Sequence, residues 1–121
     1  MPAPLDRFLA ERSGLTRTQI ETIELQKMVE KGEITATKAA SMRKPEGVTP
    51  GAYYRTLLQA KSNVEEAIYT LLLSDRLGLL QIEDFRRLLD MISKTPGSLD
   101  EVESSEIVTL VDALVKRIVM L

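Results

Sequence analysis

Arg55 and Gln59 are the side chains whose types and spacing point most directly to a chemical task. They stand four residues apart, so on a helix they share one face. A guanidinium in that position can bind guanine through two hydrogen bonds, and a carboxamide can bind adenine in the same way. The other residues left on the outer side of such a helix are small or carry a hydroxyl, namely Thr49, Gly51, Ala52 and Thr56. Small side chains at positions 51 and 52 would let the helix approach base edges closely.

The helix that would present these residues is expected to begin at Thr49, because a threonine hydroxyl suits the N-cap and Pro50 suits the first helical position. Its inward face is predicted to consist of Val48, Tyr53, Leu57 and Ala60. The helix is predicted over residues 49–61. Ser62 begins a possible second capping box, yet the apolar spacing continues to Leu71. One long helix and two abutting helices, 49–61 and 63–77, therefore both fit the sequence.

Two shorter helices upstream would hold this helix in place. The first is expected to start with Thr18 as its N-cap and Glu21 as the partner in a capping box. The second is predicted over Ala36 to about Met42, capped by Thr35. The segment Lys44-Pro45-Glu46-Gly47 then breaks the chain. A supporting helix, a link and a second helix with a polar outer face are the parts of a helix-turn-helix.

The same residues carry a resemblance to a known group. Val48-Thr49-Pro50-Gly51-Ala52-Tyr53-Tyr54-Arg55-Thr56-Leu57 resembles the pattern V-S-x-x-T-V-x-R-x-L, found in recognition helices of the C-terminal DNA-binding domain of bacterial sigma factors and related regulators. Leu15 to Leu25 is similar to the opening L-T-x-x-q-x-x-v-l-x-L of those domains. The resemblance covers roughly residues 15–62, about 40% of the chain.

This resemblance implies a role for individual residues of the chain. Thr49 would contact a phosphate, and Ala52, Arg55, Thr56 and Gln59 would face base edges. The chain departs from the pattern in its link from Ala40 to Val48, which is about three residues longer than usual for a helix-turn-helix. Tyr53 also replaces a small β-branched core residue.

Charge is distributed unevenly between the two halves of the chain. Residues 1–62 contain ten Lys and Arg against seven Asp and Glu, whereas residues 63–121 contain six against eleven. Basic charge gathered on one element suits a polyanion. Double-stranded DNA is therefore the expected partner, although each cation alone could equally be part of a solvated surface. The expected DNA-binding residues are Lys38, Arg43, Lys44, Thr49, Gly51, Ala52, Tyr54, Arg55, Thr56, Gln59 and Lys61.

The last helix, expected to follow the acidic cluster Asp100-Glu101-Val102-Glu103 and to begin near Glu106, is apolar on nearly every side. Five of its residues repeat at spacings of four and three, as on a coiled-coil seam. Such a helix must be buried, either in its own core or against a second copy of the chain. A homodimer is the favoured interpretation, and the acidic half could also contact another protein. The predicted dimer interface consists of Ile107, Val111, Leu114, Ile118 and Leu121.

The sequence lacks the residues that several classes of function require. The chain has no Cys and no His, so disulfides, thiolate or imidazole metal sites and Ser-His or Cys-His nucleophiles are excluded. The acidic cluster at residues 100–103 is better explained by the dipole of a helix N-terminus than by a metal. We expect no cofactor, no metal and no enzymatic activity. No signal peptide or membrane span is visible, which predicts a soluble protein of the cytoplasm, associated with the nucleoid.

The sequence thus predicts an all-α protein with two parts. Residues 1–62 would form a helix-turn-helix that binds DNA, and residues 63–121 a helical bundle for dimerisation or partner binding. The two parts could also form one continuous domain. The expected function is that of a transcriptional regulator whose recognition helix, about 49–61, enters the major groove. The alternative is a helical adaptor that uses the same framework to bind proteins without DNA.

Overall fold

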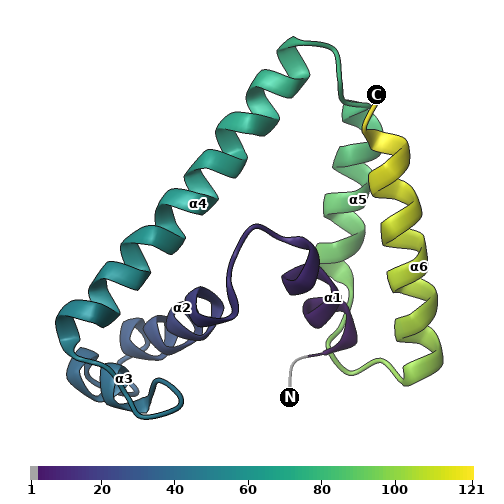
Figure 1. The fold of residues 1–121 in the computed structure, drawn as a ribbon. Helices are drawn as coiled ribbons and strands as arrows, with labels where there is room; N and C mark the ends of the chain where they lie inside the picture. The colour runs from purple at the N-terminus through teal and green to yellow at the C-terminus, as the bar shows by residue number, and fades with distance from the viewer. Residues whose placement is uncertain (1–2) are drawn as a thin grey trace. The chain divides into compact units, whose positions relative to one another are not determined.

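The computed structural model describes residues 3–121, and helices joined by short links make up this part of the chain (Figure 1). Among these residues no strand forms, and the one extended pairing is an isolated bridge between Leu80 and Val119. The prediction of an all-α protein is confirmed. The six helices of this part are α1 (Pro4–Arg12), α2 (Arg17–Glu30), α3 (Ala36–Met42), α4 (Pro50–Arg76), α5 (Ile82–Lys94) and α6 (Glu101–Ile118).

The chain divides into two compact units. One is Ser13–Ile68, and the other is Tyr69–Leu121 together with the N-terminal segment that ends at Arg12. The division expected at residues 62 and 63 falls inside α4, a single helix of 27 residues that contributes to both units. The choice left open between one long helix and two abutting helices is therefore resolved in favour of one helix.

The N-cap of α2 lies two residues before the predicted one. Thr16, rather than Thr18, is the N-cap, and its hydroxyl oxygen accepts a hydrogen bond of 3.1 Å from the Gln19 amide. The Gln19 side chain completes the capping box by accepting a bond of 3.0 Å from the Thr16 amide. A glutamine oxygen serves this motif as well as a glutamate does. Thr18 lies in the first turn instead, where its carbonyl accepts a bond from the Thr22 hydroxyl.

The predicted caps of α3 and α4 are confirmed. The Thr35 hydroxyl accepts a hydrogen bond of 3.1 Å from the Lys38 amide, and the Thr49 hydroxyl accepts one of 3.1 Å from the Ala52 amide. Each bond satisfies one of the amide groups that a helix leaves unpaired in its first turn. After α4, Gly78 takes up the left-handed conformation with φ of 73°, the common way in which a helix ends.

In Figure 1, α1, α5 and α6 lie side by side in one unit, and they share a hydrophobic core. Leu5 from α1, Leu88 from α5, and Val111 and Ile118 from α6 are buried at its centre. The Gln81 amide donates a bond of 2.9 Å to the Ile118 carbonyl, which ties the end of α6 to the start of α5. α6 begins at Glu101, earlier than predicted, because Asp100 is its N-cap and the acidic cluster forms its first turn.

The apolar stripe of α6 faces into this unit, and this changes the interpretation of the predicted dimer interface. Val111 and Ile118 are only 1% and 3% exposed, and Ile107 and Leu114 pack against the same core. The stripe meets α1 and α5, so the chain's own core occupies the surface that was expected to meet a second copy. Leu121, by contrast, is 96% exposed. Within residues 3–121, no helix has the length and hydropathy needed to cross a bilayer.

Candidate nucleic-acid interface

The start of α4 is held by a small core that it shares with α2 and α3. Tyr53 is 4% exposed and packs with Leu25, Ala39 and Ala40. The two alanines have short side chains, so they leave room for the tyrosine ring between α3 and α4. The Tyr53 hydroxyl donates a hydrogen bond of 2.9 Å to Oε1 of Gln26 on α2. This core fixes which side of α4 faces inward, and it confirms the inward positions predicted for Tyr53 and Ala60.

Burial of Tyr53 also affects its acidity. Burial raises the pKa of the Tyr53 hydroxyl above its ordinary value, and the negative charge of Glu30 raises that pKa further. The hydroxyl therefore stays protonated and remains a donor to Gln26 at ordinary pH.

The link between α3 and α4 is ordered by backbone hydrogen bonds and by one glycine in the left-handed conformation. Gly47 has φ of 78°, and a Cβ atom added there would lie 2.7 Å from the backbone oxygen of Ser41. The Val48 amide then donates a bond of 2.9 Å to the Ala40 carbonyl, and the Lys44 amide donates one of 2.8 Å to Oε1 of Glu21. The Lys44–Pro45 peptide bond is cis. These contacts order the long link that departs from the sigma-factor pattern.

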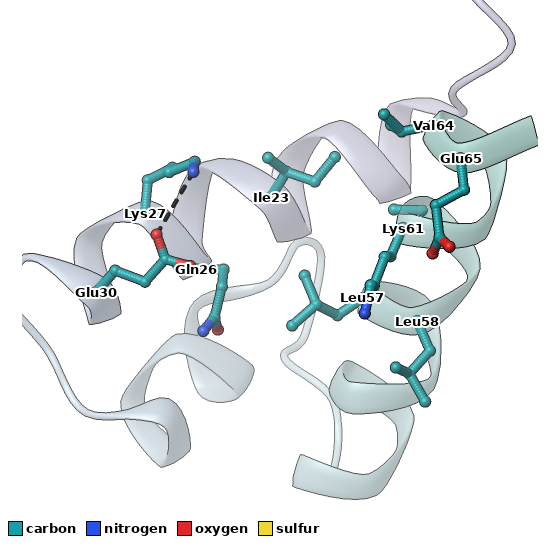
Figure 2. Close-up of a pocket in the computed structure, with 10 residues that line it drawn as sticks. Ile23, Gln26, Lys27, Glu30, Leu57, Leu58, Lys61, Val64 and Glu65 are labelled. Atoms are coloured by element: carbon teal, nitrogen blue, oxygen red, sulfur yellow. Dashed lines mark hydrogen bonds and ion pairs between the residues drawn. The ribbon is translucent and has the colours of Figure 1, made fainter. Parts of the chain in front are cut away.

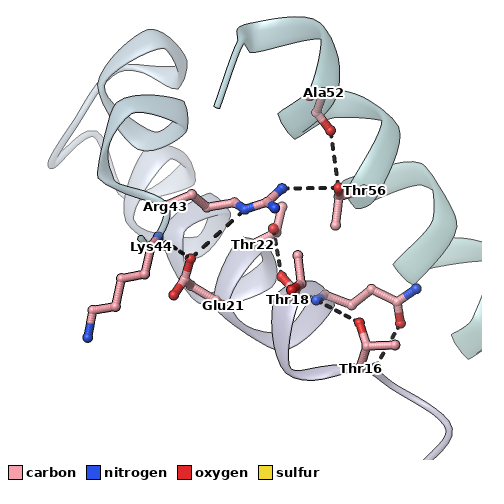
Figure 3. A network of polar contacts seen from close by, with 9 residues as sticks. Thr16, Thr18, Glu21, Thr22, Arg43, Lys44, Ala52 and Thr56 are labelled. Carbon is pink, nitrogen blue, oxygen red and sulfur yellow. Dashed lines mark hydrogen bonds and ion pairs between the residues drawn. The ribbon is translucent and has the colours of Figure 1, made fainter. Parts of the chain in front are cut away.

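Arg43 and Thr56 occupy a different place from the one that the sequence suggested. Figure 3 shows the Arg43 guanidinium between α2 and α4, where Nη1 donates a bond of 3.1 Å to Oγ1 of Thr56. Its Nε atom lies 4.0 Å from Oε1 of Glu21, and the Arg43 side chain is only 12% exposed. Thr56 in turn donates to the Ala52 carbonyl at 3.1 Å. Both residues were expected on the DNA-facing surface, but they join the link to α4 within the unit.

Little in the order of residues indicated this network of polar contacts. Glu21 was assigned to the cap of α2, and its carboxylate instead accepts from the Lys44 amide and attracts Arg43. No motif in the sequence pointed to Gln26, because its hydrogen-bond partner Tyr53 lies 27 residues further along the chain. Asn63 similarly donates a bond of 3.1 Å to Gln19 across the unit. Contacts of this kind depend on how the helices cross, which the periodicity of one helix does not reveal.

The remaining predicted residues surround the exposed side of the α4 N-terminal segment. Tyr54 is 60% exposed, and Ala52 is half-buried. Nothing lies within 4 Å of a Cβ atom added at Gly51, so packing inside the chain does not require a glycine there. The other exposed residues of the predicted set are Lys38, Lys44, Thr49, Arg55, Gln59 and Lys61.

The cations of this surface are free of carboxylates. Among the described residues, Lys38, Lys44, Arg55 and Lys61 form no ion pair. The cations of α5 and α6 differ, because each lies beside a carboxylate. All five of their cations form ion pairs: Arg86 with Glu83, Arg87 and Arg117 with Asp84, Lys94 with Asp90, and Lys116 with Asp112.

Asp112 shows the effect of such pairing on acidity. The hydrogen bond from Lys116, 2.8 Å long, holds the pKa of the Asp112 carboxyl below its ordinary value. Because their positive charge is already matched inside the chain, the cations of α5 and α6 are poorly suited to hold a second anion. The basic surface around α4 is not compensated in this way.

A groove lies on another side of the α4 segment, between α4 and α2 (Figure 2). Its volume is about 410 Å³. Ile23, Leu57 and Val64 give it apolar walls, and Lys27 and Glu30 form an ion pair of 3.5 Å at its rim. The other residues that line it are Gln26, Leu58, Ala60, Lys61 and Glu65.

Comparisons of the chain with models of protein families, with curated proteins and with solved structures gave no match. Among residues 3–121, no group of three or more acidic side chains is placed to hold a metal ion.

Proposed function

We propose that this protein binds double-stranded DNA as a transcriptional regulator, with residues 50–61 of α4 as its recognition segment. The observation that supports this proposal most directly is the set of exposed, unpaired cations around that segment, formed by Lys38, Lys44 and Arg55. Lys and Arg that neutralise phosphates release counterions from DNA, which provides most of the sequence-independent affinity. In the same chain, the cations of α5 and α6 are already neutralised.

Each part of the surface has a task in this proposal. Lys38 and Lys44 bind phosphates and set the register of the protein on the duplex. Lys61 lines the groove between α2 and α4, on another side of the helix, and is left out of this set. Arg55 and Gln59 read base edges in the major groove. The Thr49 hydroxyl accepts from the Ala52 amide, and its proton remains available to a phosphate oxygen at the positive end of the helix dipole.

Arg43 contributes indirectly. Its guanidinium binds Thr56 on α4 and lies beside Glu21 on α2, so it fixes the recognition segment relative to the supporting helices. We therefore remove Arg43 and Thr56 from the set of direct DNA contacts, and treat them as positioning residues. Ala52 stays in the set as a small residue that permits close approach.

A helical adaptor that binds a protein is the second candidate. The groove between α2 and α4, with its apolar walls of Ile23, Leu57 and Val64, favours it. Such grooves accept the apolar face of a partner helix. The unpaired cations have no role in this alternative, which is why DNA binding is preferred.

Selection of bound duplexes from a random pool, followed by fluorescence anisotropy on the recovered site, tests the proposal. Binding should weaken steeply as salt increases. Arg55→Ala should weaken binding to the recovered site by about 1–3 kcal/mol, and Lys44→Ala should reduce the salt slope by about one. Failure of the protein to retain any duplex at low salt would favour the adaptor.

Arg86→Ala provides the matched control. Arg86 is an exposed arginine like Arg55, but it lies on α5 and forms an ion pair of 2.8 Å with Glu83. Its removal should leave DNA affinity unchanged. Equal losses for Arg55→Ala and Arg86→Ala would show that only the overall charge of the protein matters, and would remove α4 from the mechanism.

A further inference from the structure

α4 has an apolar stripe beyond its recognition segment. Val64, Ile68, Leu71 and Leu72 are 44%, 53%, 38% and 59% exposed, and we call these four residues the α4 stripe. They are separated by four, three and one residues, so they lie on one side of the helix. An exposed apolar surface of this kind commonly marks an interaction site.

Two opposite charges flank the stripe at equal distances. Lys61 lies seven residues before Ile68, and Asp75 lies seven residues after it. Seven residues make about two turns, so both charges fall on nearly the same side of the helix as Ile68. Both side chains are exposed, and neither forms an ion pair with a described residue.

We propose that a second copy of this chain covers the stripe, with the two α4 helices antiparallel and the twofold axis at Ile68. In this register Lys61 of each copy faces Asp75 of the other, and Val64 faces Leu72. Two ion pairs therefore close the ends of one apolar seam, as a twofold interface requires. A parallel pair would set Lys61 against Lys61 and Asp75 against Asp75, so charge selects the antiparallel arrangement.

The groove between α2 and α4 continues this surface. Leu57, Lys61 and Val64 line the groove, and Val64 also begins the stripe. Leu72 of the second copy lies opposite Val64, at the end of the groove that meets the stripe. Side chains of the facing helix therefore have an apolar recess to enter. This interface replaces the α6 seam, whose residues Val111 and Ile118 are buried in their own unit.

Sedimentation velocity and equilibrium on residues 1–121 test the proposal, and it does not depend on DNA binding. The wild-type protein should sediment as a dimer. Ile68→Asp should give a monomer with unchanged helicity by circular dichroism, because Ile68 is 53% exposed. Leu73→Asp is the matched control: Leu73 is 57% exposed, but five residues from Ile68 it lies about 140° around the helix, so this variant should remain dimeric.

Charge reversal gives a second, independent measurement that does not disturb the apolar seam. Lys61→Asp and Asp75→Lys should each raise the dissociation constant of the dimer by about tenfold, since each converts two attractions into two repulsions. The double variant with both changes should recover most of the wild-type affinity. A monomeric wild-type protein, with the stripe covered by another part of the chain or by a different partner, overturns the proposal. So does a double variant that dimerises no better than the single variants.

Discussion

Gly47 and Gly51 lie four residues apart, but only the position of Gly47 requires a glycine. At Gly47, φ is 78° and an added Cβ atom would lie 2.7 Å from the Ser41 carbonyl oxygen. At Gly51, the backbone is helical and an added Cβ atom would meet no other atom within 4 Å. The same substitution should therefore have opposite effects on stability at these two positions.

Gly47→Ala should lower the free energy of unfolding by about 1–3 kcal/mol, because it combines a left-handed backbone with a steric clash. Gly51→Ala should raise it by about 0.4–1 kcal/mol, because alanine restricts the unfolded chain. Urea denaturation followed by circular dichroism measures both values. A stabilised Gly47→Ala variant would contradict the described turn.

The raised pKa of the Tyr53 hydroxyl leads to a prediction about stability at alkaline pH. The folded protein raises the pKa of the Tyr53 hydroxyl above the unfolded value of about 10, so folding favours the protonated form. The resulting stability is fully present below pH 10 and is lost as the pH rises through the folded pKa. Tyr53→Phe should be less stable than wild type at neutral pH, because the bond to Gln26 is lost.

The decisive measurement is the difference in unfolding free energy between wild type and Tyr53→Phe from pH 8 to pH 11. This difference should shrink as the pH rises above 10. Tyr54→Phe serves as control, since Tyr54 is 60% exposed and should show no such change. A constant difference across this range would mean that the Tyr53 hydroxyl is not held in the structure.

At the scale of elements, periodicity predicted the existence of the helices well and their first residues less well. The caps at Thr35 and Thr49 were identified because a hydroxyl residue precedes each apolar pattern directly. The cap of α2 was placed two residues late, at Thr18, because Thr16 and Thr18 both precede the apolar pattern and a threonine at either position can serve as an N-cap. The inward position of Arg43 was not predictable, since it depends on Thr56 and Glu21 from other elements.

The cap of α2 can be verified by a pair of substitutions. Thr16→Ala should cost about 1 kcal/mol of stability, because the Gln19 amide loses its acceptor. Thr18→Ala should be nearly neutral, since the Thr18 side chain is exposed and makes no cap. Thermal denaturation of both variants compares them directly. A larger loss for Thr18→Ala than for Thr16→Ala would restore the cap predicted from the sequence.

At the scale of the whole molecule, the continuity of α4 is the feature that the sequence left open. Ser62 is exposed and lies inside this helix rather than before a new one. Ser62→Ala should therefore maintain or slightly raise stability, because alanine is the better helix former and no cap is lost. Ser62→Pro should cost about 3 kcal/mol, because proline removes a hydrogen bond and clashes with the preceding turn.

Chemical denaturation of the two Ser62 variants measures this difference. If a second helix began after residue 62 instead, Ser62 would be its N-cap. Ser62→Ala would then cost about 1 kcal/mol, which is the outcome that contradicts a continuous α4.

The continuity of α4 also limits how the protein can be divided for study. A fragment that stops at residue 62 would cut the helix in the middle and leave the last four carbonyls at the cut without helical partners. The residues removed would include Asn63, whose amide binds Gln19 at the start of α2. Any fragment meant to keep α4 whole must therefore continue past Arg76 to Leu79, because the amides of Leu77, Gly78 and Leu79 bind the last carbonyls of this helix.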